Sequence, residues 1–214
     1  MTISRVMTKN PVFIHAGMTI NDARSLMDKN KIGHLPVLSR DMELNGLVTR
    51  KDLIKAGPSA VTSLDMYEIS YLLSKVTVKD VMEKKVVTVD ENEVIEEAAR
   101  IMADNGIGCL PVMRGNLLVG IITDTDLFHV FLNAFGARHP GLRITFSIPD
   151  KPGQIALLTK GIAEKGGNLV AFVSFDSDDP SRRVITMKAT GISKEDAESI
   201  VKGFEGMELD DARQ

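Results

Sequence analysis

Cysteine, tryptophan and long apolar runs are scarce or missing in this sequence of 214 residues. Its single cysteine, Cys109, cannot form an internal disulfide, so nothing indicates a secreted or oxidising compartment. Tryptophan is absent and there are only two tyrosines, which leaves no aromatic platform for stacking single-stranded nucleic acid. No run approaches the roughly 18 apolar residues of a membrane span, and residues 1–13 lack the apolar stretch of a signal peptide. We therefore expect a cytoplasmic protein.

Charge and motifs give no indication of catalysis, or of a nucleic-acid or membrane partner. The formal net charge of −3 provides no broad positive field for nucleic acid or acidic lipid. The four histidines have no metal-ligand spacing, and no serine or cysteine carries a nucleophile motif with a matching base. We expect a protein that is not an enzyme, with no catalytic residue and no metal site.

A tandem repeat organises the first two-thirds of the chain. The hexapeptide IGHLPV at residues 32–37 returns as IGCLPV at residues 107–112, an offset of 75 residues. The offset becomes 74 after one residue is lost from a loop of the second copy. The other matching blocks are residues 6–7 with 81–82, 46–49 with 120–123, and 52–53 with 126–127. Because these blocks are collinear, the chain contains two copies of one unit.

Each copy predicts the same order of elements. A short strand, residues 11–14 or 86–89, precedes a helix whose apolar residues recur at helical spacing. Asn30 and Asn105 stand where these helices should end, since asparagine tolerates the left-handed cap conformation. A strand ending in Leu-Pro-Val, a turn, an apolar strand and a second helix follow. The predicted parts are copy one at 1–57, a helical connector at 58–76, copy two at 77–136, a linker at 137–141 and a third segment at 142–214.

A Thr-x-x-Asp sequence closes the last strand of each copy, as Thr49 with Asp52 and as Thr123 with Asp126. One interpretation is an N-terminal capping box, in which the threonine accepts from a backbone N–H and the acid reaches back. The other is a ligand site, because free N–H groups at a helix start and a threonine hydroxyl attract phosphate oxygens. An aspartate one turn later can accept both hydroxyls of a ribose. The sequence leaves both interpretations open.

Strand, helix, strand with Pro-Val, and strand with Gly-φ-φ-Thr-x-x-Asp, duplicated in tandem, resemble a pair of CBS domains over about residues 1–135. The resemblance implies one disc with two clefts for adenosyl compounds, such as AMP, ADP, ATP or S-adenosylmethionine. By position, Asp52 and Asp126 would hold ribose. Thr49 and Thr123 would contact phosphate. The positions that would meet adenine are Val12, Phe13, Leu35, Pro36, Val87, Thr88, Leu110 and Pro111.

The two expected clefts differ in charge. Arg50 and Lys51 flank the first corner, whereas Asp124 replaces Arg50 in the second. An acid repels phosphate, so we expect the multiply charged nucleotide in the first cleft. The second cleft would take a neutral or cationic adenosyl ligand, or stay empty. His34 and its counterpart Cys109 are expected to be packed strand residues.

Residues 142–214 predict a different fold of βαββαβ order, with a short last strand at residues 207–209. Asp-x-Pro-Gly after the first strand and Gly-x-Asn after the first helix resemble an ACT domain. The resemblance implies that an amino acid binds at a dimer interface. The residues at the matching positions are Asp150, Gly153, Gln154 and Asn168. The alternative is a tight turn that feeds a helix, with the asparagine holding a loop.

A CBS pair followed by an ACT domain is similar to the AcuB-type proteins associated with acetoin utilisation. The implied fold class is mixed α/β (α+β), with a CBS-domain pair and a ferredoxin-like βαββαβ domain. The implied function is a non-catalytic regulatory sensor, in which the CBS pair binds an adenine nucleotide or adenosyl ligand and the ACT domain binds an amino acid or transmits the signal. We expect a homodimer that regulates an unidentified partner protein. The alternative is a ligand-free scaffold that holds a partner enzyme.

Overall fold

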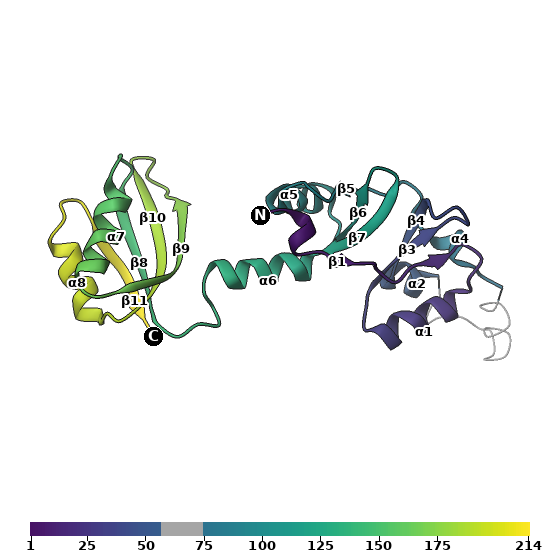
Figure 1. The fold of residues 1–214 in the computed structure, drawn as a ribbon, viewed down its shortest axis with the longest axis horizontal. Helices are drawn as coiled ribbons and strands as arrows, with labels where there is room; N and C mark the ends of the chain where they lie inside the picture. The colour runs from purple at the N-terminus through teal and green to yellow at the C-terminus, as the bar shows by residue number, and fades with distance from the viewer. Residues whose placement is uncertain (57–74) are drawn as a thin grey trace. The chain divides into compact units, whose positions relative to one another are not determined.

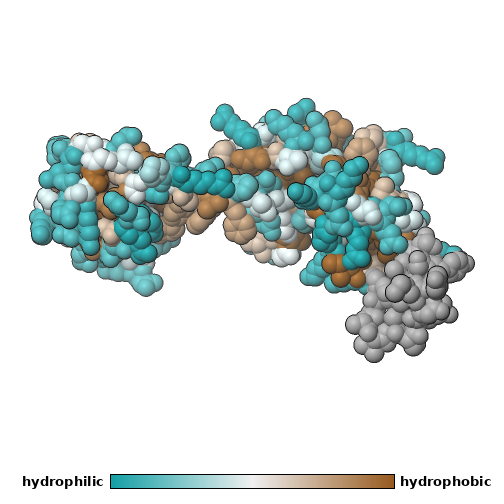
Figure 2. All heavy atoms as spheres, turned by 90° about the horizontal axis from the view of Figure 1, so that it is seen from below, coloured by the Kyte–Doolittle hydropathy of each residue, from teal (hydrophilic) through white to brown (hydrophobic). Residues whose placement is uncertain are grey.

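The computed structural model describes residues 1–56 and 75–214 of the chain (Figure 1). These residues form two compact units, Met1–Leu127 and Phe128–Gln214. The predicted helical connector at residues 58–76 lies almost wholly outside the described residues. No helix of the described part is long and apolar enough to cross a membrane. On the face drawn in Figure 2, hydrophilic residues predominate.

The first unit contains the two copies of the repeat. Up to residue 56 its elements are a 3₁₀ helix (Ile3–Arg5), β1 (Thr8–Lys9), β2 (Ile14–His15), α1 (Ile20–Asn30), β3 (His34–Leu38), β4 (Leu44–Thr49) and α2 (Arg50–Lys55). From residue 75 they are α4 (Val78–Val81), β5 (Val89–Asp90), α5 (Ile95–Asn105), β6 (Cys109–Arg114), β7 (Leu117–Thr123) and α6 (Asp124–Ala134), which continues into the second unit. One sheet has the strand order β2-β3-β4 and the other the order β1-β7-β6-β5. In both sheets a parallel pair joined by a helix precedes an antiparallel hairpin. The order of these elements is the one that the repeat predicts.

Helices α1 and α5 end at Asn30 and Asn105, but the capping mechanism differs from the predicted one. The left-handed residue is the next one along the chain, Lys31 with φ 56° or Gly106 with φ 62°. Each asparagine side chain instead donates to a backbone carbonyl one turn earlier, at 2.9 and 2.8 Å from N to O. The prediction of a left-handed asparagine is therefore wrong, because the asparagine itself stays helical and the residue after it takes the left-handed conformation.

The strands predicted at residues 11–14 and 86–89 are shorter in the structure, where β2 and β5 have two residues each. Only Ile14 and Val89, the last residue of each predicted segment, reach the parallel ladder with β3 and β6. The residues before them do not pair within the named strands and approach the rims of cavities. These segments therefore contribute to cavity walls rather than to the sheets.

The opening segment of each copy packs on the core of the other copy. Ile3 and Met7 are buried in the core around α5, whereas Val78 is buried in the core around α1. β1 pairs with β7, and the backbone of Glu83 exchanges two hydrogen bonds with Leu47 of β4, both 2.9 Å from N to O. The two copies are thus interlocked, and neither core is completed by consecutive residues of its own copy.

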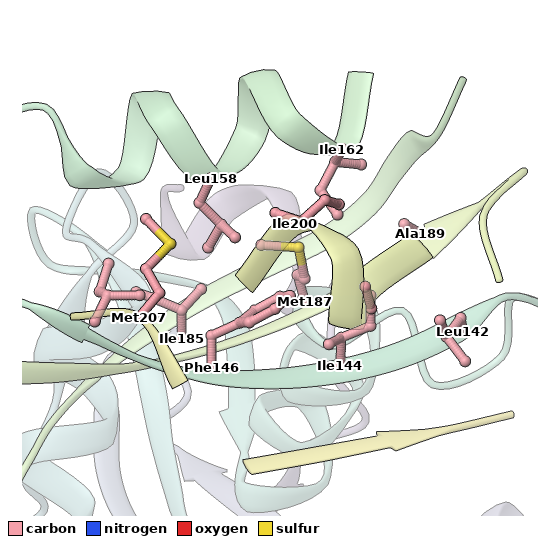
Figure 3. Close-up of a cluster of buried hydrophobic side chains, with 12 residues drawn as sticks. Leu142, Ile144, Phe146, Leu158, Ile162, Ile185, Met187, Ala189, Ile200 and Met207 are labelled. Carbon is pink, nitrogen blue, oxygen red and sulfur yellow. The ribbon is translucent and has the colours of Figure 1, made fainter. Parts of the chain in front are cut away.

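The second unit has the predicted βαββαβ order. Its elements are β8 (Leu142–Pro149), α7 (Gln154–Glu164), β9 (Asn168–Asp176), β10 (Arg182–Thr190), α8 (Lys194–Lys202) and β11 (Glu208–Arg213). The four strands form an antiparallel sheet in the order β11-β8-β10-β9. Ile144 and Phe146 of β8 pack with Leu158 of α7 and Ile200 of α8 (Figure 3). The core of this unit therefore lies between one face of the sheet and its two helices.

The last strand is longer than the predicted one at residues 207–209. β11 runs over Glu208–Arg213 and pairs with β8. Its register shifts between Leu209 and Asp211, so a bulge at this point allows the pairing to continue beyond it. Met207 precedes the strand and is buried in the core instead.

Candidate functional site

The first Thr-x-x-Asp corner is a capping box. β4 ends at Thr49, which is the N-cap of α2. The backbone N–H and the hydroxyl of Thr49 both donate to Oδ2 of Asp52, at 2.9 and 2.7 Å, and the Asp52 N–H donates to the Thr49 Oγ1 at 3.3 Å. The backbone N–H of Arg50 donates to the carbonyl of Gly33 at 2.8 Å. The capping interpretation therefore holds for this corner.

The second corner has the same geometry. The backbone N–H and the hydroxyl of Thr123 donate to Oδ2 of Asp126, both at 2.8 Å, and the Asp126 N–H donates to Oγ1 at 3.4 Å. The backbone N–H of Asp124 donates to the carbonyl of Gly108 at 3.0 Å.

This arrangement changes the role expected of the threonines. A hydroxyl has one proton to donate, and in both corners that proton is directed at a carboxylate. Neither Thr49 nor Thr123 can therefore donate to a phosphate while its box is intact. Each threonine instead holds its aspartate in place, and the box uses only Oδ2, so Oδ1 lies outside it.

A cavity of about 500 Å³ opens at the first corner, and we call it the first cleft. The first copy contributes Thr49 and Asp52 to its wall. The second copy contributes Val87 and residues 106–109, the loop that leads into β6. The first cleft is therefore completed only when the two copies come together.

A cavity of about 490 Å³ opens at the second corner, and we call it the second cleft. Thr123 and Asp126 of the second copy line it together with Val12 and residues 31–34 of the first copy. The two clefts are therefore built in the same way, each from the corner of one copy and from two segments of the other.

The remaining predicted adenine contacts lie elsewhere. Four of them are buried strand residues: Leu35, Pro36, Leu110 and Pro111. The two leucines are fully buried because they point from β3 and β6 into the two cores. Phe13 and Thr88 line two further cavities, of about 510 and 580 Å³. The structure thus brings Val12 and Val87 to the clefts but not Phe13 or Thr88.

The loops before β3 and β6 line the clefts in place of the buried Leu-Pro pairs, and the sequence analysis missed them. Gly33 lines both clefts and Gly108 lines the first. A Cβ added to Gly33 would meet no atom within 4 Å. The glycine in both hexapeptides was the available signal, since a residue without a side chain lets a ligand approach the backbone.

His34 lies between the two clefts and lines both of them. Burial lowers the pKa of its imidazole, while the charges of Asp124 and Asp52 act in the opposite direction. Cys109 occupies the equivalent place in the second copy, where each of the two residues pairs with the threonine of its own corner. Burial, together with the charge of Asp124, raises the pKa of the Cys109 thiol to about 12. The centre of the unit therefore carries an imidazole and an unreactive thiol.

The four residues predicted to bind an amino acid do not come together within one chain. Asp150, Gly153 and Gln154 lie at or just beyond the Pro149 end of β8, where Gly153 has φ 87° and is the N-cap of α7. Asn168 pairs with Thr190 at the opposite end of the sheet, because α7 runs the length of the sheet before β9 begins. Within the described residues, no group of three or more His, Cys, Asp or Glu side chains could hold a metal ion.

Comparison with known proteins gives matches for the first unit. A family model described as "CBS domain" matches residues 3–59 and 78–133. A homoserine O-acetyltransferase of Methanosalsum zhilinae is 33% identical over 128 residues, which are 59% of this chain and 23% of that protein. The chain thus spans less than a quarter of the length of the curated relatives of this name.

Two solved structures resemble the chain over a similar share. A Vibrio cholerae protein proposed to be an acetoin utilization protein (AcuB) is 32% identical, with a TM-score of 0.52, over 62% of this chain and 91% of that chain. The CBS domain pair of protein MJ0100, solved in complex with 5′-methylthioadenosine and S-adenosyl-L-methionine, is 25% identical. Its TM-score is 0.52, over 64% of this chain and 98% of that chain.

Proposed function

We propose that this chain, which belongs to the CBS-domain family, is a non-catalytic regulatory sensor that binds adenosyl ligands in its two clefts. The observation that carries the proposal is the matched construction of the clefts. Each is lined by an aspartate held in a capping box of one copy and by a glycine-containing loop of the other. A ligand in either cleft would contact both copies, so it could favour one arrangement of the copies over another.

The chemistry of the clefts supports an adenosyl ligand. Oδ1 of Asp52 and of Asp126 is left outside the capping box, where it can accept a ribose hydroxyl. Val12 and Val87 are about one-third exposed at the cleft walls, with relative exposures of 38% and 37%, and offer an apolar surface to an adenine. The resemblance to the MJ0100 domain pair, solved with two adenosyl compounds, points to the same ligand class.

For the second unit we propose an ACT-type role in a cytoplasmic homodimer. Asp150 and Asn168 lie at opposite ends of one sheet, so an amino-acid site that uses both would need two copies of the chain. The unit would bind an amino acid in this way or transmit the state of the clefts to a partner protein. The resemblance to the Vibrio cholerae structure suggests a role in acetoin or carbon metabolism.

One observation favours a second candidate, a constitutive scaffold for a partner enzyme. Both capping boxes are complete from the residues of the protein alone, so the corners have a structural role that needs no ligand. Under this alternative the clefts are by-products of the way the two copies interlock.

Thermal unfolding with AMP, ATP, S-adenosylmethionine or 5′-methylthioadenosine separates the two candidates. A ligand at about 100 times its Kd stabilises the folded state by about 2.7 kcal/mol, whereas a scaffold gains nothing. Asp52→Ala and Asp126→Ala should each abolish the shift of the ligand held in that cleft. Asp80→Ala is the matched control, because Asp80 accepts the same two bonds from Thr77 outside both clefts, at 2.9 and 2.7 Å. No shift with any of these compounds at millimolar concentration would favour the scaffold.

A further inference from the structure

The two clefts have the same construction but opposite charge. Basic side chains outnumber carboxylates in the first cleft, where the charged residues are Arg50, Lys51, Asp52, Lys55, Glu83 and Lys85. Carboxylates outnumber basic side chains in the second, where the charged residues are Lys31, Asp124 and Asp126. His34 is common to both clefts and cannot account for the difference.

The difference is largest at one pair of equivalent positions. Arg50 and Asp124 each follow the threonine of a corner. The backbone N–H of each donates to the carbonyl of the glycine in the loop before β3 or β6 of its own copy. The backbones of the two residues therefore make the same hydrogen bond, while their side chains differ by two units of charge. Asp124 has no ion-pair partner among the residues that the structure describes.

The positive charge of the first cleft does not depend on Arg50 alone. Its guanidinium is tethered, with Nη1 2.5 Å from Oδ1 of Asp28 and Nη2 3.1 Å from the Ile32 carbonyl oxygen. Lys51, Lys55 and Lys85 form no ion pair within the described part of the chain. They are exposed lysines whose charges remain available to a multiply charged ligand. Lys85 comes from the second copy, so this charge too is assembled from both copies.

We propose that the two clefts divide adenosyl ligands by charge. The first cleft takes an adenine nucleotide, whose phosphates lie among the lysines and Arg50. The second takes an adenosyl sulfonium or its uncharged thioether, because Asp124 stands where the first cleft has Arg50, repels phosphate and attracts a cation. The protein would then bind two classes of metabolite at the same time, one in each cleft. This inference rests on the proposed function and deepens it.

Isothermal titration calorimetry with three ligands tests the division. ATP is an anion, S-adenosylmethionine carries a net positive charge, and 5′-methylthioadenosine is uncharged. Asp52→Ala should abolish ATP binding and Asp126→Ala should abolish S-adenosylmethionine binding, which assigns each ligand to its cleft. Saturation with ATP should leave the S-adenosylmethionine sites free.

Charge variants then test the cause. Asp124→Arg should lower the affinity for S-adenosylmethionine by about tenfold at low salt, because it reverses a charge a few ångströms from the ligand. It should change the affinity for 5′-methylthioadenosine by less than about twofold. Lys51→Glu should lower the affinity for ATP by a similar factor, and it leaves the ion pair of Arg50 with Asp28 intact. Binding of 5′-methylthioadenosine reports that Asp124→Arg is folded with an open second cleft, and unchanged S-adenosylmethionine binding reports that Lys51→Glu is folded.

The two possible failures are distinguishable. If ATP and S-adenosylmethionine compete for one cleft, or if the charge variants change all three ligands equally, the division by charge is overturned while adenosyl binding stands. If the wild-type protein binds none of the three ligands at millimolar concentration, the proposed function itself is overturned. Assigned clefts with opposite responses to the two charge variants support the division.

Discussion

Replacing Gly46 with alanine probes the interlocking of the two copies. A Cβ at Gly46 would lie 2.7 Å from Sδ of Met82 and 2.9 Å from the carbonyl oxygen of Glu83. The thioether can move aside, but the carbonyl cannot, because the Glu83 backbone exchanges two hydrogen bonds with Leu47, the residue next to Gly46. The added methyl group must therefore push the opening segment of the second copy away from β4.

The size of the effect follows from two opposing contributions. Overpacking of this kind costs about 1–3 kcal/mol, and each weakened backbone hydrogen bond adds about 1 kcal/mol. Alanine recovers about 0.5–1 kcal/mol relative to glycine, since it restricts the unfolded chain. We expect a net loss of about 1–3 kcal/mol in the free energy of unfolding of the first unit.

Urea unfolding followed by circular dichroism measures this loss. Gly17→Ala is the matched control, because a Cβ at Gly17 meets nothing within 4 Å, and its stability should stay the same or rise slightly. At Gly120, the sulfur of Met7 is the nearest atom and the nearest backbone oxygen, that of Thr8, is 3.1 Å away. A shorter side chain at Met7 should therefore rescue much of the Gly120→Ala defect. Equal stability of Gly46→Ala and Gly17→Ala would refute the close contact between the copies.

Three other perturbations test the site directly. Asp126→Ala removes a capping box and should lower the free energy of unfolding by about 0.5–2 kcal/mol without any ligand, so an unchanged urea midpoint would contradict the capping geometry. Burial lowers the pKa of His34 below its unfolded value of 6.5, so the unfolded chain takes up the proton first as the pH falls. The free energy of unfolding therefore decreases as the pH falls through 6.5 towards the pKa of the folded state. His34→Gln should flatten that part of the stability profile between pH 7.5 and 5.5, and an identical slope would count against the burial. Cys109, with a thiol pKa of about 12 and 3% exposure, should react with a thiol reagent at pH 8 only after unfolding, whereas rapid labelling of the native protein would contradict the structure.

Capping, one of the two interpretations that the sequence leaves open for the corners, could be foreseen because its geometry is local. Thr and Asp three residues apart at a strand–helix junction can close a capping box without any distant contact, and both corners do so. The order of elements in each copy follows in the same way from short-range periodicity. The left-handed cap was misplaced by one residue, since Asn30 and Asn105 have an alternative in donating to the helix itself.

The exchange of opening segments could not be predicted, because it depends on long-range packing. The repeat offset is the same whether Met7 packs on its own copy or on Gly120 of the other. The loops that line the clefts were missed for a related reason. Strand alternation turns Leu35 into the core and places His34 beside the clefts, but the sequence alone does not show which side of the strand a cleft occupies.

The crystal structure of the protein grown with 5′-methylthioadenosine and ATP tests the central claim most directly. The account predicts the thioether in the second cleft and ATP in the first, with ribose hydroxyls within hydrogen-bond distance of Oδ1 of Asp126 and of Asp52. Empty clefts at saturating ligand, or ligands bound in the cavities lined by Phe13 and Thr88, would contradict it.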